Sequence, residues 1–195
     1  MARLIVLEGG EGAGKSTQAT LLARDLHALS TREPGGTPLG EAVRQVVLSP
    51  SLRAVVARAE TLLVLAARAQ HVAEVIEPAL ARGQDVVCDR YSPSTLAYQG
   101  YGRGLSLPEL AELNRWATEG RQPDLVVLLD VPVDVARRRR QGTPRDRIEG
   151  EGDEFLERVR DGFRRLAAAD PDRWRTVDGS GTVEEVAASV REVVG

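Results

Sequence analysis

Lysine is nearly absent from this chain. Of the 26 basic side chains, 25 are arginine, and Lys15 is the only lysine. The single cysteine, Cys88, cannot form an internal disulfide, so the cysteine content does not require an oxidising compartment. No apolar run approaches the roughly 20 residues that a membrane span needs, and the apolar residues 4–7 are too few for a signal peptide. We therefore expect a cytoplasmic protein with no membrane partner.

The rest of the composition is that of an ordinary globular protein. The 195 residues are 42% hydrophobic and 28% charged, which argues against a disordered chain or a repeat architecture. This length suits one domain with a substantial core, so we expect a single domain over residues 1–195. The net charge of -3 argues against a broad nucleic-acid surface, so no nucleic-acid partner is expected.

Short apolar runs alternate with helical patterns along the chain. The sequence predicts strands over 3–8, 85–88, 125–129 and 174–177, and helices over 16–26, 52–82, 151–169 and 182–194, with another helix starting near 106. Strands that alternate with helices form a parallel sheet with right-handed crossovers. The expected fold class is therefore α/β, with three layers and a roughly five-stranded parallel sheet flanked by helices.

A glycine-rich loop follows the first predicted strand and precedes the first predicted helix. It matches Gly-x-x-x-x-Gly-Lys-Ser, the Walker A pattern of P-loop proteins, and its residues are Gly9, Gly10, Glu11, Gly12, Ala13, Gly14, Lys15 and Ser16. Glycines let such a loop turn its amide groups toward phosphate oxygens. We expect the loop to bind ATP, with Lys15 on the terminal phosphates and Ser16 on Mg²⁺. Thr17 either adds a hydroxyl near a phosphate or caps the helix.

A phosphate-binding loop does not by itself separate a kinase from a switch protein or a motor. The guanine-reading pattern Asn-Lys-x-Asp of switch GTPases is excluded, because the only lysine is Lys15 and the only asparagine, Asn114, precedes Arg115. A kinase of a small acceptor and an ATP-dependent switch or assembly protein both stay open at this point.

Four further segments carry a resemblance to a known family. They are Thr31-Arg32-Glu33-Pro34-Gly35-Gly36-Thr37, Ala66-Ala67-Arg68-Ala69-Gln70, Asp89-Arg90-Tyr91 continuing to Ala97-Tyr98-Gln99-Gly100, and Asp146-Arg147-Ile148-Glu149. Together with the loop they lie in the order found in bacterial thymidylate kinases, which this chain resembles over most of its length. The resemblance implies transfer of the ATP γ-phosphoryl group to dTMP, giving dTDP and ADP in dTTP biosynthesis, with Mg²⁺ and in a homodimer. Compared with that family the chain is short before Thr31, which predicts a second strand that is either short or irregular and leaves the placement of Arg32 open.

Phosphoryl transfer to a nucleoside monophosphate needs positive charge more than a general base, because the attacking phosphate oxygen is already ionised. Arg90 follows a predicted strand, so it projects from the carboxyl end of the sheet, where α/β folds bind ligands. In the resembled family the matching arginine bridges the acceptor and donor phosphates, whereas from geometry alone a salt bridge is the alternative. Asp89 either holds a Mg²⁺-bound water or orients Arg90.

The resemblance also implies a dTMP site. In that family the arginine matching Arg68 contacts thymine, although the residues alone favour a surface arginine on an amphipathic helix. The family places an aromatic residue at the position of Val64, so the base loses a π-face here. An acidic residue at the position of Glu11 approaches the 3′-hydroxyl of the sugar. The predicted dTMP-binding residues are Glu11, Arg32, Val64, Arg68, Arg90, Ser94, Thr95, Tyr98 and Gln99. For the last three, local capping and packing is the alternative.

Residues 132–150 form a basic segment with six arginines against three carboxylates. The resemblance implies a mobile lid over ATP at about 137–150, which carries the catalytic arginines in members that lack one in the phosphate loop. Consecutive helical residues point about 100° apart, so Arg137–Arg140 cannot all face one ligand. A nucleic-acid patch is the competing interpretation, weakened by the absence of interleaved aromatics. The predicted catalytic residues are Lys15, Arg90, Arg145 and Arg147, and Arg138 and Arg140 are predicted to bind ATP.

Overall fold

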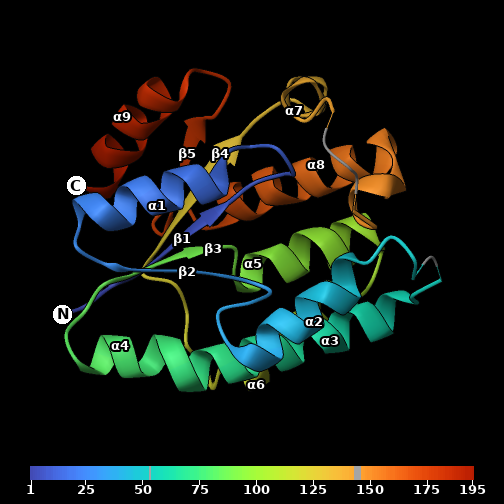
Figure 1. Cartoon of the computed structure of the whole chain (residues 1–195), viewed down its shortest axis with the longest axis horizontal. Helices are drawn as coiled ribbons and strands as arrows, with labels where there is room; N and C mark the ends of the chain where they lie inside the picture. Colours follow the sequence, from blue (N-terminus) through green and yellow to red (C-terminus); the bar gives the residue numbers. More distant parts are fainter. Residues whose placement is uncertain (53, 143–145) are drawn as a thin grey trace.

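The computed structural model describes residues 1–52, 54–142 and 146–195. A parallel five-stranded sheet runs through its centre with the order β2-β3-β1-β4-β5 (Figure 1). The strands are β1 (Leu4–Glu8), β2 (Leu29–Arg32), β3 (Val86–Asp89), β4 (Leu125–Asp130) and β5 (Trp174–Asp178). The predicted α/β fold is confirmed, and the second strand is short, as the sequence indicated.

Helices cover both faces of this sheet. They are α1 (Lys15–Asp25), α2 (Pro38–Leu48), α3 (Ala57–His71), η1 (Val72–Ile76), α4 (Glu77–Ala81), α5 (Ser92–Thr95), η2 (Leu96–Gly102), α6 (Leu107–Ala117), α7 (Val133–Arg139), η3 (Glu149–Glu151), α8 (Asp153–Ala169) and α9 (Val183–Val194). The helix predicted over 52–82 begins only at Ala57, and it runs through α3, the π-helical η1 and α4. The helix α2 was not predicted from the sequence, although Thr37 caps it by accepting a hydrogen bond from Gly40 N at 3.0 Å.

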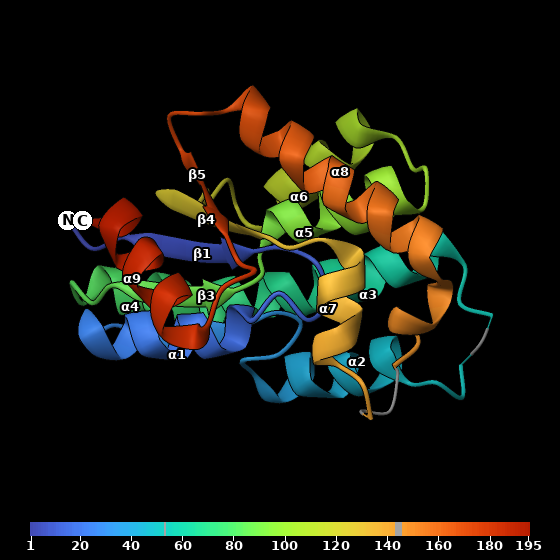
Figure 2. The ribbon, with the colours of Figure 1, turned by 90° about the horizontal axis from the view of Figure 1, so that it is seen from above.

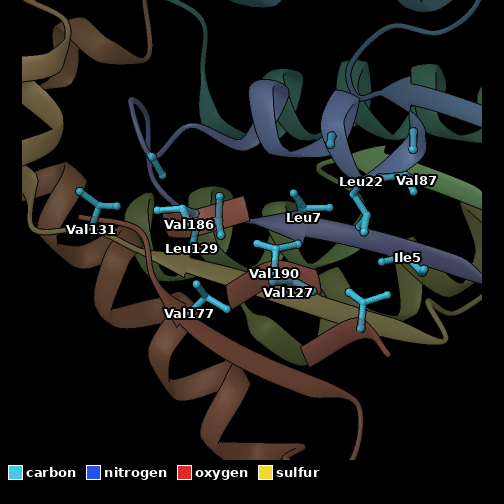
Figure 3. Close-up of a cluster of buried hydrophobic side chains, with 14 of the residues drawn as sticks. Ile5, Leu7, Leu22, Val87, Val127, Leu129, Val131, Val177, Val186 and Val190 are labelled. Carbon is cyan, nitrogen blue, oxygen red and sulfur yellow. The ribbon is translucent and has the colours of Figure 1, made fainter. Parts of the chain in front are cut away.

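Successive side chains of each strand point to opposite faces of the sheet, so each strand contributes to two parts of the core. On one face, Leu7 packs in a cluster with Leu22 of α1 and Val190 of α9 (Figure 3). On the other face, Val6 packs with Ile76 of η1, while α8 covers the neighbouring part of that face over β4. The sheet is thus the middle of three layers, and every residue of its central strand β1 is buried.

The strand order reverses at β1, which lies between β3 and β4. Ligands of open α/β sheets bind at the carboxyl ends of the strands where such a reversal occurs. Backbone hydrogen bonds continue past the strand ends there, from Arg90 N to Leu7 O at 3.0 Å and from Glu33 N to Asp89 O at 2.9 Å. Seen from above, α7 lies beyond this end of the sheet (Figure 2). Among the residues that the structure describes, no helix is long and apolar enough to cross a membrane.

Candidate functional site

The phosphate loop spans residues 9–14 between β1 and α1. Gly9 has a φ of 144°, and a Cβ there would lie 2.5 Å from the carbonyl oxygen of Leu129. Gly14 is the N-cap of α1 and has a left-handed φ of 90°. Only glycine takes these positions without strain, and the loop therefore passes from strand to helix in the manner that the Walker A pattern predicts.

Lys15 opens α1 with its ammonium buried, and Nζ donates to the carbonyl of Gly10 at 2.7 Å. Burial lowers the pKa of Lys15 and the Arg90 guanidinium lowers it further, against the opposite effect of Glu11. Thr17 is exposed on the first turn of α1. The lysine therefore lies inside the loop, where its charge can meet phosphate oxygens.

Arg90 connects the loop to the helical segments α5 and η2. Its backbone has a positive φ of 74° directly after β3. Nη1 donates to Gly9 O at 2.9 Å and to Ser94 Oγ at 3.3 Å. Nη2 donates to Glu11 Oε1 at 2.6 Å and to Tyr98 OH at 2.9 Å. The guanidinium thus holds groups from both sides of the site.

Glu11 and Arg90 are both ionised at neutral pH. Burial alone would raise the pKa of Glu11, but the neighbouring Arg90 and Lys15 outweigh it and lower that pKa to about 2. Burial also opposes the charge of Arg90, yet Glu11 and the other nearby acidic groups raise its pKa. Glu11 is therefore an ionised carboxylate that balances one of two closely placed cations.

Ser16 and Asp89 meet beside the loop, where Ser16 Oγ donates to Asp89 Oδ2. Asp89 Oδ1 is buried and has no hydrogen-bond partner within the described residues. Mg²⁺ takes oxygen ligands and usually keeps several waters, so one hydroxyl and one carboxylate with a free oxygen fit its needs beside phosphates. The predicted metal residues are therefore together, and their chemistry suits Mg²⁺.

Glu8 is a fully buried carboxyl group at the end of β1. Its Oε1 accepts from the backbone N–H groups of Tyr91 and Ser94 at 2.9 and 3.2 Å, and its Oε2 accepts from Ser94 Oγ at 2.6 Å. Burial raises the pKa of Glu8 to about 7, despite the opposing charge of Arg90. The sequence analysis assigned it no role. The signal was a carboxylate that ends a buried apolar strand.

A pocket of about 670 Å³, open to solvent, lies beside the Arg90 guanidinium. We call it the main pocket. The structure brings eight of the nine predicted dTMP-binding residues to its wall, namely Glu11, Val64, Arg68, Arg90, Ser94, Thr95, Tyr98 and Gln99. They come from the loop, α3, the end of β3, α5 and η2, so only the folded chain assembles them.

Arg32 is the predicted residue that does not line the main pocket. It ends the edge strand β2, and its half-exposed guanidinium pairs with Glu41 Oε2 of α2 at 2.9 Å. Arg44 of α2 lines the pocket instead and donates to Pro34 O at 3.1 Å. Arg44 was not among the predicted site residues, because the helix α2 that carries it was not predicted.

Arg68 is buried, with 2% of its surface exposed, so the interpretation of it as a surface arginine is wrong. Nε donates to Glu33 Oε2 at 2.7 Å. Nη1 donates to Thr95 Oγ1 and Asn114 Oδ1 at 2.7 and 2.6 Å, and Nη2 donates to Tyr91 O at 2.9 Å. Four of the five guanidinium N–H groups are thereby engaged, and the remaining Nη2 N–H has no partner within the described residues. Arg68 also lines the main pocket.

The apolar part of the pocket wall is aliphatic. Val64, Leu48 and Ile148 contribute branched side chains. Among the described lining residues the aromatic ring is that of Tyr98, and its face is occupied by Arg90, with 4.9 Å between the guanidinium carbon and the ring centre. A base in this pocket would therefore meet aliphatic groups at the position where the resembled family offers an aromatic ring.

Arg140, from the segment predicted to form a lid, lies against the phosphate loop. A Cβ at Gly12 would lie 2.9 Å from Arg140 Cδ, so the arginine stem occupies the space that a side chain at position 12 would need. Arg140 also pairs with Glu149. Arg138, by contrast, is 60% exposed and pairs with Asp134 on α7. The expectation that these arginines cannot all face one ligand is confirmed.

Arg147 lies away from the phosphate loop. Nε donates to Val47 O of α2 at 2.9 Å, and Nη2 pairs with Glu60 Oε2 of α3 at 2.7 Å. The structure therefore does not bring this predicted catalytic arginine to the phosphate site. Arg145, the other predicted lid residue of that kind, lies outside the described residues.

Comparison with known proteins gives one consistent family. The family model described as "Thymidylate kinase" matches residues 7–190. A thymidylate kinase from Pseudomonas savastanoi pv. phaseolicola is 50% identical over 192 residues, covering 95% of this chain and 91% of that protein. One from Cupriavidus metallidurans is 46% identical over 197 residues, covering 98% and 97%. The crystal structure of thymidylate kinase from Ehrlichia chaffeensis superposes with a TM-score of 0.81 at 32% identity, over 99% of this chain and 98% of that one. This chain therefore belongs to the thymidylate kinase family.

Proposed function

We propose that the chain transfers the γ-phosphoryl group of ATP to dTMP, giving dTDP and ADP, as a step of dTTP biosynthesis. The observation that carries the proposal is the position of Arg90, whose guanidinium contacts the phosphate loop at Gly9 and the main pocket at Ser94 and Tyr98. A guanidinium placed between two sites can hold a phosphate from each. The named relatives agree with this acceptor and support neither a different small acceptor nor an assembly protein.

The chemistry requires positioning and charge rather than a base. The attacking group is a phosphate oxygen of dTMP, which is ionised at neutral pH, so no side chain has to remove a proton. The bond between the γ-phosphorus and the β,γ-bridging oxygen of ATP breaks, which releases ADP, and a new bond forms between that phosphorus and the dTMP phosphate oxygen. Negative charge spreads over the transferring group as this happens. Lys15 and Arg90 both border the loop, and they stabilise this charge.

On the donor side, the amides of residues 9–14 and the positive end of α1 bind the ATP phosphates. Ser16 and Asp89 would hold Mg²⁺, directly or through a water. The ion would supply positive charge that neutralises the phosphates of ATP. The unpartnered Asp89 Oδ1 supports this assignment.

On the acceptor side, dTMP occupies the main pocket with its phosphate at Arg90. Arg44 adds positive charge to the same wall. Glu11 is placed for the 3′-hydroxyl of the sugar, because its carboxylate is ionised and lies at the junction of pocket and loop. Arg68 and Gln99 face the base, which packs against Val64. A direct contact of Arg32 with dTMP stays a prediction.

We further propose that residues 1–195 form one domain and that residues 137–150 act as its lid over ATP. The contact of Arg140 with the loop at Gly12 supports a lid that supplies charge to the donor phosphates. Catalytic roles for Arg145 and Arg147, and a role for Arg138 in ATP binding, stay predictions.

A homodimer is the proposed assembly. Leu62 of α3 and Leu113 and Trp116 of α6 are exposed, with 79% of the Trp116 surface accessible. Exposed apolar side chains on neighbouring helices are typical of a contact between copies. Light scattering on wild type and Trp116→Glu tests the proposal, and a monomeric wild type would contradict it. A cytoplasmic location also stays a prediction.

A coupled assay of ADP release tests the activity across dTMP, dUMP, dCMP, dGMP, dAMP and the deoxynucleosides. We expect dTMP to give the highest kcat/KM, and omission of Mg²⁺ to abolish turnover. Preference for another acceptor would assign the chain to a different substrate, and turnover independent of any acceptor would contradict a kinase.

A further inference from the structure

A buried carboxylate on α3 lies behind the wall of the main pocket. Glu60 has none of its surface exposed. Oε1 accepts from Gln99 Nε2 at 2.8 Å and from Arg103 Nε at 3.3 Å. Oε2 accepts from Arg103 Nη2 at 3.0 Å and pairs with Arg147 Nη2 at 2.7 Å. Arg103 and Arg147 therefore balance the negative charge of Glu60, and the Gln99 amide from the pocket wall donates a further hydrogen bond to it.

This contact determines how Gln99 is oriented. An ionised carboxylate only accepts hydrogen bonds, so the side-chain amide must turn its NH₂ group, and not its oxygen, toward Glu60. Burial alone would raise the pKa of Glu60, but the hydrogen bonds from Arg103 and Gln99 outweigh it and lower that pKa, so the group is ionised at neutral pH. Gln99 also lines the main pocket, and within the described residues no donor meets its Oε1. The oxygen is therefore the atom that Gln99 offers to a bound base.

We propose that Glu60 is a positioning residue that fixes the Gln99 amide with its oxygen toward the base, and thereby selects a pyrimidine that carries an N–H at ring position 3. This inference rests on the proposed function and adds the group that sets its selectivity. Thymine carries that N–H, which would donate to Gln99 Oε1. Cytosine has an unprotonated nitrogen there, so its lone pair would face the oxygen and both acceptors would be left unpaired.

The spare N–H of Arg68 acts in the same direction. Four of its N–H groups are engaged, and the remaining one can only donate. It suits a carbonyl of thymine and disfavours the amino group of cytosine. Glu60, Val64 and Arg68 follow one another at intervals of four residues on α3, which places them along the same side of the helix. Val64 and Arg68 line the main pocket, and Glu60 lies one turn before Val64.

The direct test is Glu60→Gln. The variant amide can present either an oxygen or an NH₂ to Gln99, so the Gln99 amide is free to turn. We expect the ratio of kcat/KM for dTMP to that for dCMP to fall by about tenfold or more, as one misdirected hydrogen bond implies. Calorimetry measures the affinities for dTMP and dCMP in the absence of ATP, when no turnover occurs. The ratio of these two affinities should fall by the same factor.

Arg103→Gln is the matched control. It removes charge pairing from Glu60 and the contact of Arg103 with the Phe155 ring, but leaves Gln99 Nε2 facing a carboxylate. We expect it to lower the melting temperature and to keep the dTMP to dCMP ratio. If Glu60→Gln lost activity toward both nucleotides in parallel, as in a merely structural role, the proposal would be overturned.

A second variant keeps the test decisive should Glu60→Gln fold poorly. Gln99→Met removes the amide and leaves Glu60 with its two arginines. We expect a similar fall in the ratio, and no further fall when Glu60→Gln is added to Gln99→Met. Additive losses would refute action through Gln99. A wild type without any dTMP preference would instead contradict the proposed function, so the two failures are distinguishable.

Discussion

Replacing Glu8 by glutamine should change how the stability of the fold depends on pH. The glutamine oxygen can accept from Tyr91 N and Ser94 N as Oε1 does, and its NH₂ group can donate to Ser94 Oγ. The Glu8→Gln variant therefore reproduces the protonated form of the carboxyl group but cannot ionise. Any difference between the two proteins that varies with pH reports the buried charge.

The magnitude follows from the shifted pKa of Glu8. Burial raises it from 4.5 to about 7, so the folded state holds the proton more strongly than the unfolded chain does. The stabilisation from this group is complete below pH 4.5 and is lost as the pH rises to about 7. At about 1.4 kcal/mol for each pKa unit, the loss amounts to about 3 kcal/mol, and the glutamine variant does not undergo it.

Urea denaturation between pH 4.5 and 8 measures this effect as the difference in unfolding free energy between wild type and Glu8→Gln. We expect the variant to gain about 3 kcal/mol relative to wild type across that interval and no more above it. Glu112→Gln, which removes an exposed carboxylate paired with Arg115, serves as the control. The difference in unfolding free energy between Glu112→Gln and wild type should not rise by about 3 kcal/mol over this pH interval. Parallel curves for wild type and Glu8→Gln would refute the reasoning.

Three further predictions concern turnover, measured in the same ADP-release assay. Arg90→Ala should lower kcat by about a hundredfold or more through lost charge stabilisation, and near-normal turnover would make Arg90 structural. Val64→Phe should lower the KM for dTMP by about threefold to tenfold, since an added ring contributes about 0.5–1.5 kcal/mol; a raised KM would mean that the aliphatic wall has no room for a ring. Arg140→Met should lower kcat more than Arg147→Met, because only Arg140 contacts the loop; the reverse order would place Arg147 at the phosphates in the closed lid.

The sequence predicted the sheet and the phosphate loop well, because both depend on short-range patterns. Buried parallel strands are continuous apolar runs, and the glycines of residues 9–14 have conformations that few other residues adopt. The loop between β2 and α2 is rich in turn residues, so the whole segment was predicted as a loop. The start of α2 is marked by the Thr37 cap and Pro38, which were not recognised as helix signals. Arg44 was missing from the predicted site for the same reason.

The other differences between the sequence predictions and the structure come from contacts between residues that are far apart in the chain. Arg68 is buried because Glu33, Asn114 and Thr95 surround its guanidinium, and these residues come from three other parts of the chain. A helical pattern alone cannot show such partners, so it favoured the surface. Glu60 and Arg68 lie eight residues apart in a largely apolar helical stretch. Charged residues at about two helical turns from each other among apolar ones were a usable signal that both are buried.

The hydrogen bonds from Arg90 N to Leu7 O and from Glu33 N to Asp89 O extend the sheet ladder into the site itself. The spacing between the loop that follows β1 and the guanidinium that follows β3 is thus set by the backbone of central strands, which are the last parts of such a fold to open. Local opening of α2 or of the proposed lid would leave that spacing unchanged. The loop and Arg90 therefore unfold together with the central strands, as one cooperative unit. Substrates can enter and leave without a change in the distance between the loop and the Arg90 guanidinium.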